Sequence, residues 1–93
     1  MNMYSLNNSI FSNANTEGIF ILSPAGETLI LKDEVSCLIF KGFKEEDTQS
    51  LEQIFEVVRH NFKISIEEEQ FQKDISEFVE VLIQHQIIQV KNL

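Results

Sequence analysis

The residue types that most often carry catalysis are scarce in this chain of 93 residues, which contains one cysteine and two histidines. A cysteine nucleophile needs a neighbouring base, and no His or Asn lies close to Cys37 in the sequence, so a small buried side chain is predicted there. His60 and His85 are 25 positions apart (85 − 60). Because no third ligand follows at a metal-binding spacing, these histidines are better explained as residues near helix C-termini than as metal ligands.

Two groups of carboxylates have the spacing of a ligand set or of an acid–base pair. The run 45–47, Glu-Glu-Asp, lacks the glycine and the spaced oxygen ligands of a calcium loop, so a solvated loop is predicted. Asp74 and Glu77 are one helical turn apart, but no nucleophile or oxyanion donor can be named beside them. The three glycines are too far apart for a phosphate-binding loop. The sequence therefore predicts no catalytic residue, no metal and no cofactor, and an enzyme is the least favoured class.

The charge balance narrows the remaining classes of function. Fifteen acidic and seven basic residues give a formal net charge of -8 and a pI near 4.6. Such a chain repels nucleic acid at long range and has no polybasic patch for an anionic membrane surface, so neither is predicted as a partner. A basic or neutral peptide is electrostatically easier to bind.

The composition is that of one globular domain, because 43% of the residues are apolar and eight of them are Phe. One cysteine excludes an intrachain disulfide and fits a reducing compartment. The first 15 residues have neither the basic start nor the apolar stretch of a signal peptide, and no apolar run is long enough to span a bilayer. We therefore expect a cytoplasmic protein.

Strand signals occupy the first third of the chain. Residues 1–15 are a polar segment rich in Asn and Ser, in which the pattern permits a short first strand around Ser9–Ser12. The apolar runs Gly18–Leu22 and Thr28–Leu31 flank a stretch that contains a proline and a glycine, two residues that favour turns. This pattern predicts a β-hairpin.

Two helices are expected in the middle of the chain. Asp33 is a suitable N-cap for a helix over residues 34–41, and Gly42 is expected to end it. Ser50 and Gln53 have the spacing of a capping box, which predicts the start of a second helix. Apolar residues follow at three- and four-residue spacing, as in an amphipathic helix.

A third helix is expected after a second capping-box pattern, formed by Ser65 and Glu68, and it should end near His85 or Gln86. Residues 87–90 are interpreted as a terminal strand or as an extended tail. Four phenylalanines at helical spacing are expected in the core: Phe55, Phe62, Phe71 and Phe78.

The order of these elements predicts an α+β domain of winged-helix type over residues 16–90, with a three-stranded antiparallel sheet followed by three α-helices. Such a sheet has at least one open edge. An open edge at Thr28–Leu31 would offer unpaired backbone groups to an extended peptide. Proline at Leu29 or Leu31 is expected to abolish this pairing, because proline has no N–H to donate.

The polar face of the third expected helix is mostly acidic. Its carboxylates are Glu67, Glu68, Glu69, Asp74, Glu77 and Glu80, and Lys73 is its one lysine. Affinity for DNA depends on Lys and Arg contacts with phosphates, so this helix is predicted to face a core or a peptide. A groove between the helix and the open strand would hold the side chains of that peptide.

Several stretches between Gly18 and Ile88 resemble the PqqD-like proteins, the recognition elements of ribosomally synthesised and post-translationally modified peptides. The matching stretches are the hairpin IFILSPAGETLILK, the segment LKDEVSCLIF, the helix start TQSLEQI, the turn ISIEE, and DISEFVEVL followed by HQII. The similarity is a pattern of positions and not a catalytic signature. Asp33 replaces the usual capping Asn. Gln86 stands where a Gly is common, so the third helix is expected to end less sharply.

The resemblance implies a non-catalytic domain that binds the leader of a precursor peptide. The leader would add to the sheet as a strand and pack against the third helix. The domain would then present the peptide to a modifying enzyme such as a radical SAM maturase, a cyclodehydratase or a leader peptidase. Carried over by position, the edge strand would consist of Thr28, Leu29, Ile30 and Leu31. The wall of the groove would come from Lys73, Asp74, Ser76, Glu77, Glu80 and Val81, with Ile75, Phe78 and Leu82 beneath them.

Two alternatives keep the same fold class. A winged-helix DNA-binding regulator would change the partner, although the acidic charge argues against it. A structural interaction subunit, such as a dimerisation module or a small inhibitor of another protein, would form a stable complex and show no affinity for a leader-like peptide.

Overall fold

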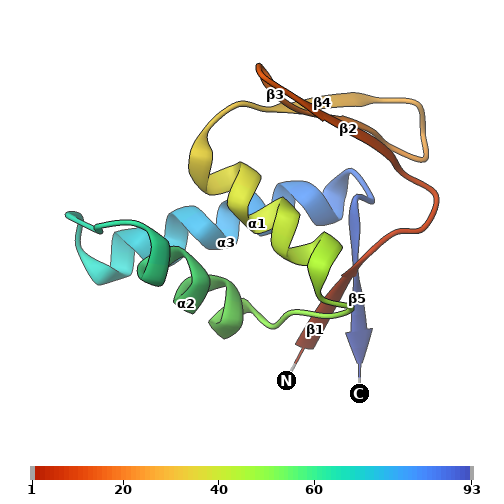
Figure 1. The fold of residues 1–93 in the computed structure, drawn as a ribbon. Coiled ribbons are helices and arrows are strands. Elements are labelled where there is room, and N and C mark those ends of the chain that lie inside the picture. Colours follow the sequence, from red (N-terminus) through yellow and green to blue (C-terminus); the bar gives the residue numbers. More distant parts are fainter. Residues whose placement is uncertain (1, 93) are drawn as a thin grey trace.

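The computed structural model describes residues 2–92 of the chain (Figure 1). In chain order its elements are β1 (Asn2–Leu6), β2 (Phe11–Asn15), β3 (Gly18–Leu22), β4 (Thr28–Leu31), α1 (Glu34–Glu45), α2 (Leu51–Asn61), α3 (Glu68–Gln84) and β5 (Ile88–Asn92). The strands form a three-stranded antiparallel sheet of order β2-β3-β4 and a separate ribbon of β1 and β5. The expected α+β fold, with a three-stranded sheet followed by three helices, is confirmed.

The three-stranded sheet has one buried face and one exposed face. In the register of β3 and β4, Ile19 pairs with Leu31 and Phe20 pairs with Ile30. Ile19 and Leu31 are buried toward the helices, whereas Phe20 and Ile30 are 37% and 55% exposed on the other face. This alternation is typical of an antiparallel sheet covered on one side.

The first strand of this sheet lies slightly later than expected. The pattern permitted a strand around Ser9–Ser12, and β2 covers Phe11–Asn15. Its register, from Phe11 opposite Leu22 to Asn15 opposite Gly18, leaves a two-residue loop to β3. Residues 2–15 thus supply both β1 and β2, although their polar composition gave little strand signal.

α1 begins where the sequence predicts, because Asp33 Oδ2 accepts a hydrogen bond from the backbone N–H of Ser36 at 2.9 Å. The predicted end at Gly42 is wrong, since the helix continues to Glu45. A Cβ at Gly42 would lie 3.0 Å from the side-chain nitrogen of Gln49. Gly42 therefore serves a close approach between the helix and the following loop, and it is not a stop signal.

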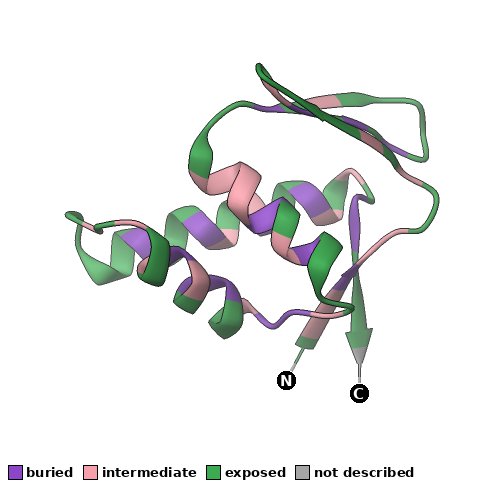
Figure 2. Ribbon diagram, viewed as in Figure 1, coloured by how far each residue is buried: buried purple, intermediate pink, exposed green. Residues whose placement is uncertain are grey.

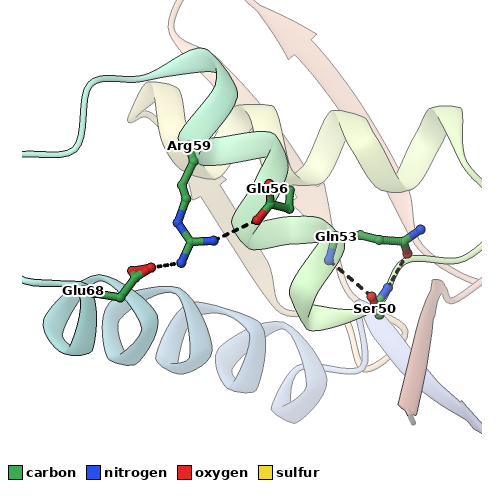
Figure 3. Close-up of polar contacts among 5 residues, drawn as sticks. All are labelled: Ser50, Gln53, Glu56, Arg59 and Glu68. Atoms are coloured by element: carbon green, nitrogen blue, oxygen red, sulfur yellow. Dashed lines mark hydrogen bonds and ion pairs between the residues drawn. The ribbon is translucent and has the colours of Figure 1, made fainter.

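The capping box at the start of α2 is confirmed. Ser50 Oγ accepts a hydrogen bond from the N–H of Gln53 at 3.2 Å, and Gln53 Oε1 accepts one from the N–H of Ser50 at 2.7 Å (Figure 3). Two N–H groups at the helix start are satisfied in this way.

Arg59 joins the end of α2 to the start of α3. It forms ion pairs with Glu56 at 3.0 Å and with Glu68, the first residue of α3 (Figure 3). Its guanidinium carbon lies 5.7 Å from the ring centroid of Phe55 and 5.1 Å from that of Phe71. The ion pairs are open to solvent and contribute little, while each cation–π contact contributes about 0.5–1 kcal/mol.

The capping box predicted at Ser65 is wrong. Glu67 is the N-cap of α3, and its side chain makes no capping hydrogen bond. Ser65 lies in the loop between α2 and α3, two residues before the cap, and is exposed. Glu68 and Glu69 fall in the first turn, where their charges favour the positive end of the helix dipole.

The predicted end of α3 is confirmed, with His85 as the C-cap. Gln86 follows with a φ of 60°. Its N–H donates to the Ile83 carbonyl at 2.9 Å, and the N–H of Ile87 donates to the Leu82 carbonyl at 2.8 Å. These two bonds form a Schellman motif, so the helix ends sharply even though Gln replaces the usual Gly.

One hydrophobic core lies between the inner face of the sheet and the three helices (Figure 2). Of the four phenylalanines expected there, Phe55 and Phe71 are buried, whereas Phe62 and Phe78 are half-buried at its margin. The helices that surround this core can also be compared with membrane-spanning helices. None of the helices in the described part of the chain has the length and apolar character needed to cross a bilayer.

The residues after α3 form a strand, which decides between the two alternatives for 87–90. β5 pairs antiparallel with β1, from Asn2 opposite Asn92 to Leu6 opposite Ile88. Tyr4 of β1 also exchanges two backbone hydrogen bonds with Gln49, at 2.8 and 2.9 Å. The ribbon therefore ties both ends of the described chain to the loop before α2 (Figure 1).

Candidate functional site

β4 is an edge strand of the three-stranded sheet. The N–H of Ser23 donates to the Glu27 carbonyl at 2.7 Å, and this bond sets the alternation along the β3–β4 ladder. Hydrogen-bonded and non-hydrogen-bonded residue pairs alternate along an antiparallel ladder, and Ser23 and Glu27 form a hydrogen-bonded pair. Thr28 and Ile30 therefore fall in non-hydrogen-bonded pairs, and their backbone N–H and C=O groups point away from β3. The edge therefore presents two N–H and two C=O groups to an added strand.

Leu29 and Leu31 direct their backbone groups inward, to β3. The Leu31 carbonyl also accepts a hydrogen bond from Cys37 Sγ at 3.3 Å, and a Cβ on Gly18 would collide with the same oxygen. Proline at Leu29 or Leu31 would therefore break the β3–β4 ladder itself. The expectation that these two positions test an added strand is wrong, and Thr28 and Ile30 are the positions to use.

Two contacts relate α3 to the residues on either side of β4. At its C-terminal end, His85 Nδ1 lies 3.3 Å from Oε1 of Glu27, in the turn before β4. Near its N-terminal end, Asp74 lines a pocket together with Val35, which is in the first turn of α1 just after β4. The side of α3 that carries Asp74 and His85 therefore faces the β3–β4 turn and the start of α1.

Phe78 and Val81 lie on the same side of α3, four and seven residues after Asp74. Phe78 is half-buried and packs against the core, whereas Val81 is 40% exposed. Half-buried Leu29 supplies an apolar side chain on the inner face of β4. We refer to the open edge of β4, together with Asp74, Phe78 and Val81, as the β4–α3 site.

A pocket of about 290 Å³ opens at one end of the β4–α3 site, where α3 begins. Most of its wall is apolar, and Lys63 and Asp74 bring the two charges to it. The lining residues are Val35, Val58, Lys63, Ile64, Ser65, Ile66, Phe71, Asp74 and Ile75. Ile66 is 49% exposed in the loop before α3, so this pocket can cover an apolar side chain brought by a partner.

Some of the α3 residues predicted for the wall point elsewhere. With about 100° of rotation per residue, Lys73, Ser76 and Glu80 point roughly 100°, 160° and 120° away from Asp74 around the helix. Glu77 stays near the β4 side, one turn before Val81. Asp74, Phe78 and Val81 therefore share one side of α3, and Lys73 and Ser76 point away from that side.

Sequence reasoning missed the pocket and the contact between His85 and Glu27. Two of the pocket residues, Ile64 and Ile66, belong to the loop that was interpreted as a break and a capping box. The sequence signal that could have indicated the pocket is the presence of these apolar residues in an otherwise polar loop. The pairing of His85 with Glu27 joins residues 58 positions apart, and no local pattern indicates it.

The groups considered for catalysis stay apart in the structure. Cys37 is half-buried, more open than predicted, and its thiol donates to a backbone carbonyl. His85 faces a carboxylate of the β3–β4 turn and not a nucleophile. Among residues 2–92, no three His, Cys, Asp or Glu side chains gather in a group that could hold a metal ion.

No family model matches the sequence, and no match was found among curated proteins. Two solved structures are similar. One is TbiB1 in complex with the TbiA(beta) leader peptide, with a TM-score of 0.75 and 16% identity, covering 91% of this chain and 94% of that chain. The other is lasso peptide synthetase B1 complexed with the leader peptide, with a TM-score of 0.71 and 17% identity, covering 92% and 96%.

The chain shares the fold of these two proteins. At 16–17% identity this likeness concerns the backbone, and it agrees with the resemblance to recognition elements seen in the sequence. The alignments cover almost all of both chains. The comparisons give no support to the DNA-binding alternative.

Proposed function

We propose that this chain is a non-catalytic recognition domain that binds the leader of a precursor peptide. The observation that carries the proposal is the open edge of β4, in a hairpin that contacts α3 through Glu27 and His85. It is supported by the shared fold of two proteins that were solved with leader peptides.

The leader adds to β4 as a further strand. Its backbone pairs with the N–H and C=O groups of Thr28 and Ile30, and its side chains alternate between the two faces of the sheet. Those on the inner face pack on Phe78 and Val81 and reach the pocket at the start of α3. Leu29 and Leu31 hold the edge strand in place through their pairing with β3.

Side chains supply more of the affinity than the backbone does. A net hydrogen bond contributes about 0.5–1.5 kcal/mol, whereas a fully buried Leu or Phe side chain contributes about 1.5–3 kcal/mol. A dissociation constant near 1 μM corresponds to a binding free energy of about 8 kcal/mol. A few backbone hydrogen bonds and a few buried side chains supply this amount after the cost of ordering the peptide is subtracted.

The bound peptide is then presented to a modifying enzyme, such as a radical SAM maturase, a cyclodehydratase or a leader peptidase. The part of the chain that binds the leader is the domain at residues 16–90, which contains β3, β4 and α3. β2 precedes this range and completes the sheet. We place this step in the cytoplasm, where a lone thiol such as Cys37 stays reduced.

A binding titration tests the proposal. The probe is a fluorescein-labelled leader peptide encoded by a short open reading frame next to this gene, with duplex DNA of similar length as the control. Saturable binding of the leader near or below micromolar, with no binding of DNA, is expected. Salt-dependent DNA binding would revive the regulator alternative, and a stable self-complex without leader binding would favour the structural subunit.

A further inference from the structure

The β4–α3 site combines apolar contact area with carboxylates that lack a cation. Asp74 Oδ1 accepts a hydrogen bond from Gln70 at 2.7 Å. Within the described chain no Lys, Arg or His nitrogen lies within 4.0 Å of the carboxylate of Asp74 or Glu77. Both carboxylates flank Val81 and Phe78, the apolar residues that a bound peptide would cover.

We propose that the peptide bound at the β4–α3 site carries a Lys or Arg among the side chains that face α3. This inference rests on the proposed function, since it concerns the same site, and it adds the chemistry that selects one leader over another. The stem of a Lys or Arg would lie on Val81 and Phe78, and its charged head would reach Glu77 or Asp74. Arg fits better, because its planar guanidinium can hold a carboxylate with two hydrogen bonds.

The position of the basic residue follows from the other charges around the site. Lys63 lines the pocket at the start of α3, and Lys32 directly follows β4 on the chain. Lys63 shares that pocket with Val35 in the first turn of α1, so both cations lie near the connection from β4 to α1. The basic residue of the peptide is therefore expected beside Glu77 and Val81, toward the middle of α3, with an apolar residue at the pocket.

The same charges argue against a second copy of this chain as the occupant. A net charge of -8 makes two copies repel each other, and the face that would be covered contributes carboxylates of its own. A basic peptide is attracted by the whole molecule and by the site. Its binding should weaken as the ionic strength rises, because these exposed charges are screened.

Selection from a displayed library of random 14-residue peptides tests this inference. The library is selected in parallel against the unchanged chain, the pair Asp74→Asn with Glu77→Gln, and the pair Glu69→Gln with Glu80→Gln. The two pairs remove the same charge from the same helix, but Glu69 and Glu80 point roughly 140° and 120° away from Asp74 around the helix. All four positions are exposed, so all variants should fold.

The unchanged chain should enrich peptides that combine alternating apolar residues with Lys or Arg. The best such peptide should bind about five- to ten-fold more weakly to the Asp74/Glu77 pair, the combined effect of two exposed ion pairs, and within about two-fold to the control pair. Enriched peptides without a basic residue, or equal losses in both pairs, would overturn the inference and leave strand addition standing. The enriched peptides are also tested for binding to Ile30→Pro. No enrichment, or binding that is equally strong in Ile30→Pro, would overturn strand addition and this inference with it.

Discussion

His85 Nδ1 and Glu27 Oε1 lie 3.3 Å apart, although the two residues are 58 positions apart in the chain. Glu27 is in the turn between β3 and β4, and His85 caps the C-terminus of α3. The contact therefore holds one end of the open strand edge against the helix that forms the other side of the β4–α3 site.

Replacing Glu27 with Gln is expected to weaken leader binding about two- to three-fold. The pair is partly exposed, so it contributes at most about 1 kcal/mol, and unfolding should change little. Fluorescence anisotropy with the labelled leader and urea unfolding measure the two effects. Glu46→Gln, at the exposed C-cap of α1, removes an equal charge outside the β4–α3 site and should leave binding unchanged. A larger loss of stability than of affinity would give the contact a purely structural role.

Proline at Ile30 is expected to abolish leader binding in a folded protein. The N–H of Ile30 points to the open edge, so proline removes a donor that β3 does not use. Ile30→Ala keeps the N–H and separates the effect of the side chain. Ala14→Pro is the matched control, because the register places the N–H of Ala14 on the other open edge, that of β2. Circular dichroism verifies folding, and anisotropy measures affinity. Leader binding that survives Ile30→Pro and fails in Ala14→Pro would move the peptide to β2.

Ser50→Ala is expected to lower the free energy of unfolding by about 1 kcal/mol, because it removes the side-chain acceptor of the capping box. Ser65→Ala should change it by less than about 0.5 kcal/mol, since Ser65 is exposed and does not cap α3. Urea unfolding of the two variants provides the comparison. Equal losses would mean that Ser65 caps α3 in solution.

Gln86→Gly is expected to raise the free energy of unfolding by about 0.5–1 kcal/mol. Gln86 holds a φ of 60°, where a side chain costs energy and glycine does not, and this gain exceeds the larger freedom of glycine in the unfolded chain. Gln72→Gly, at an exposed position inside α3, is the control and should lower stability by about 1 kcal/mol. Thermal unfolding followed by circular dichroism measures both, and a loss in Gln86→Gly would show that its side chain makes a needed contact.

The parts of the fold that could be predicted depend on short-range signals. Asp33 and Ser50 mark helix starts because the hydrogen bonds they make reach only three residues along the chain. The β3–β4 hairpin was predicted for the same reason. The end of α1 was predicted wrongly at Gly42, because this glycine makes room for the side chain of Gln49, which follows the end of α1.

The candidate site was only partly accessible to sequence reasoning, because it depends on how distant elements meet. The strand edge was located correctly, but the direction of each backbone group along Thr28–Leu31 depends on the register with β3. The orientation of α3 likewise separates Asp74 from Lys73, which are neighbours in the sequence. The packing of α3 against the rest of the domain decides which of its polar residues face the hairpin. The apolar pattern of α3 identifies only its buried side.

The β1–β5 ribbon has a consequence for the order of folding. Pairing Asn2 with Asn92 closes a loop of 90 positions (92 − 2), so its entropy cost is among the largest in the chain. Hairpins such as β3–β4 close loops of a few residues and can form early, whereas the ribbon has to wait until the helices have brought its two strands together. We therefore expect the ribbon to form late and to open early, which would give its amides less protection from hydrogen exchange than those of β3.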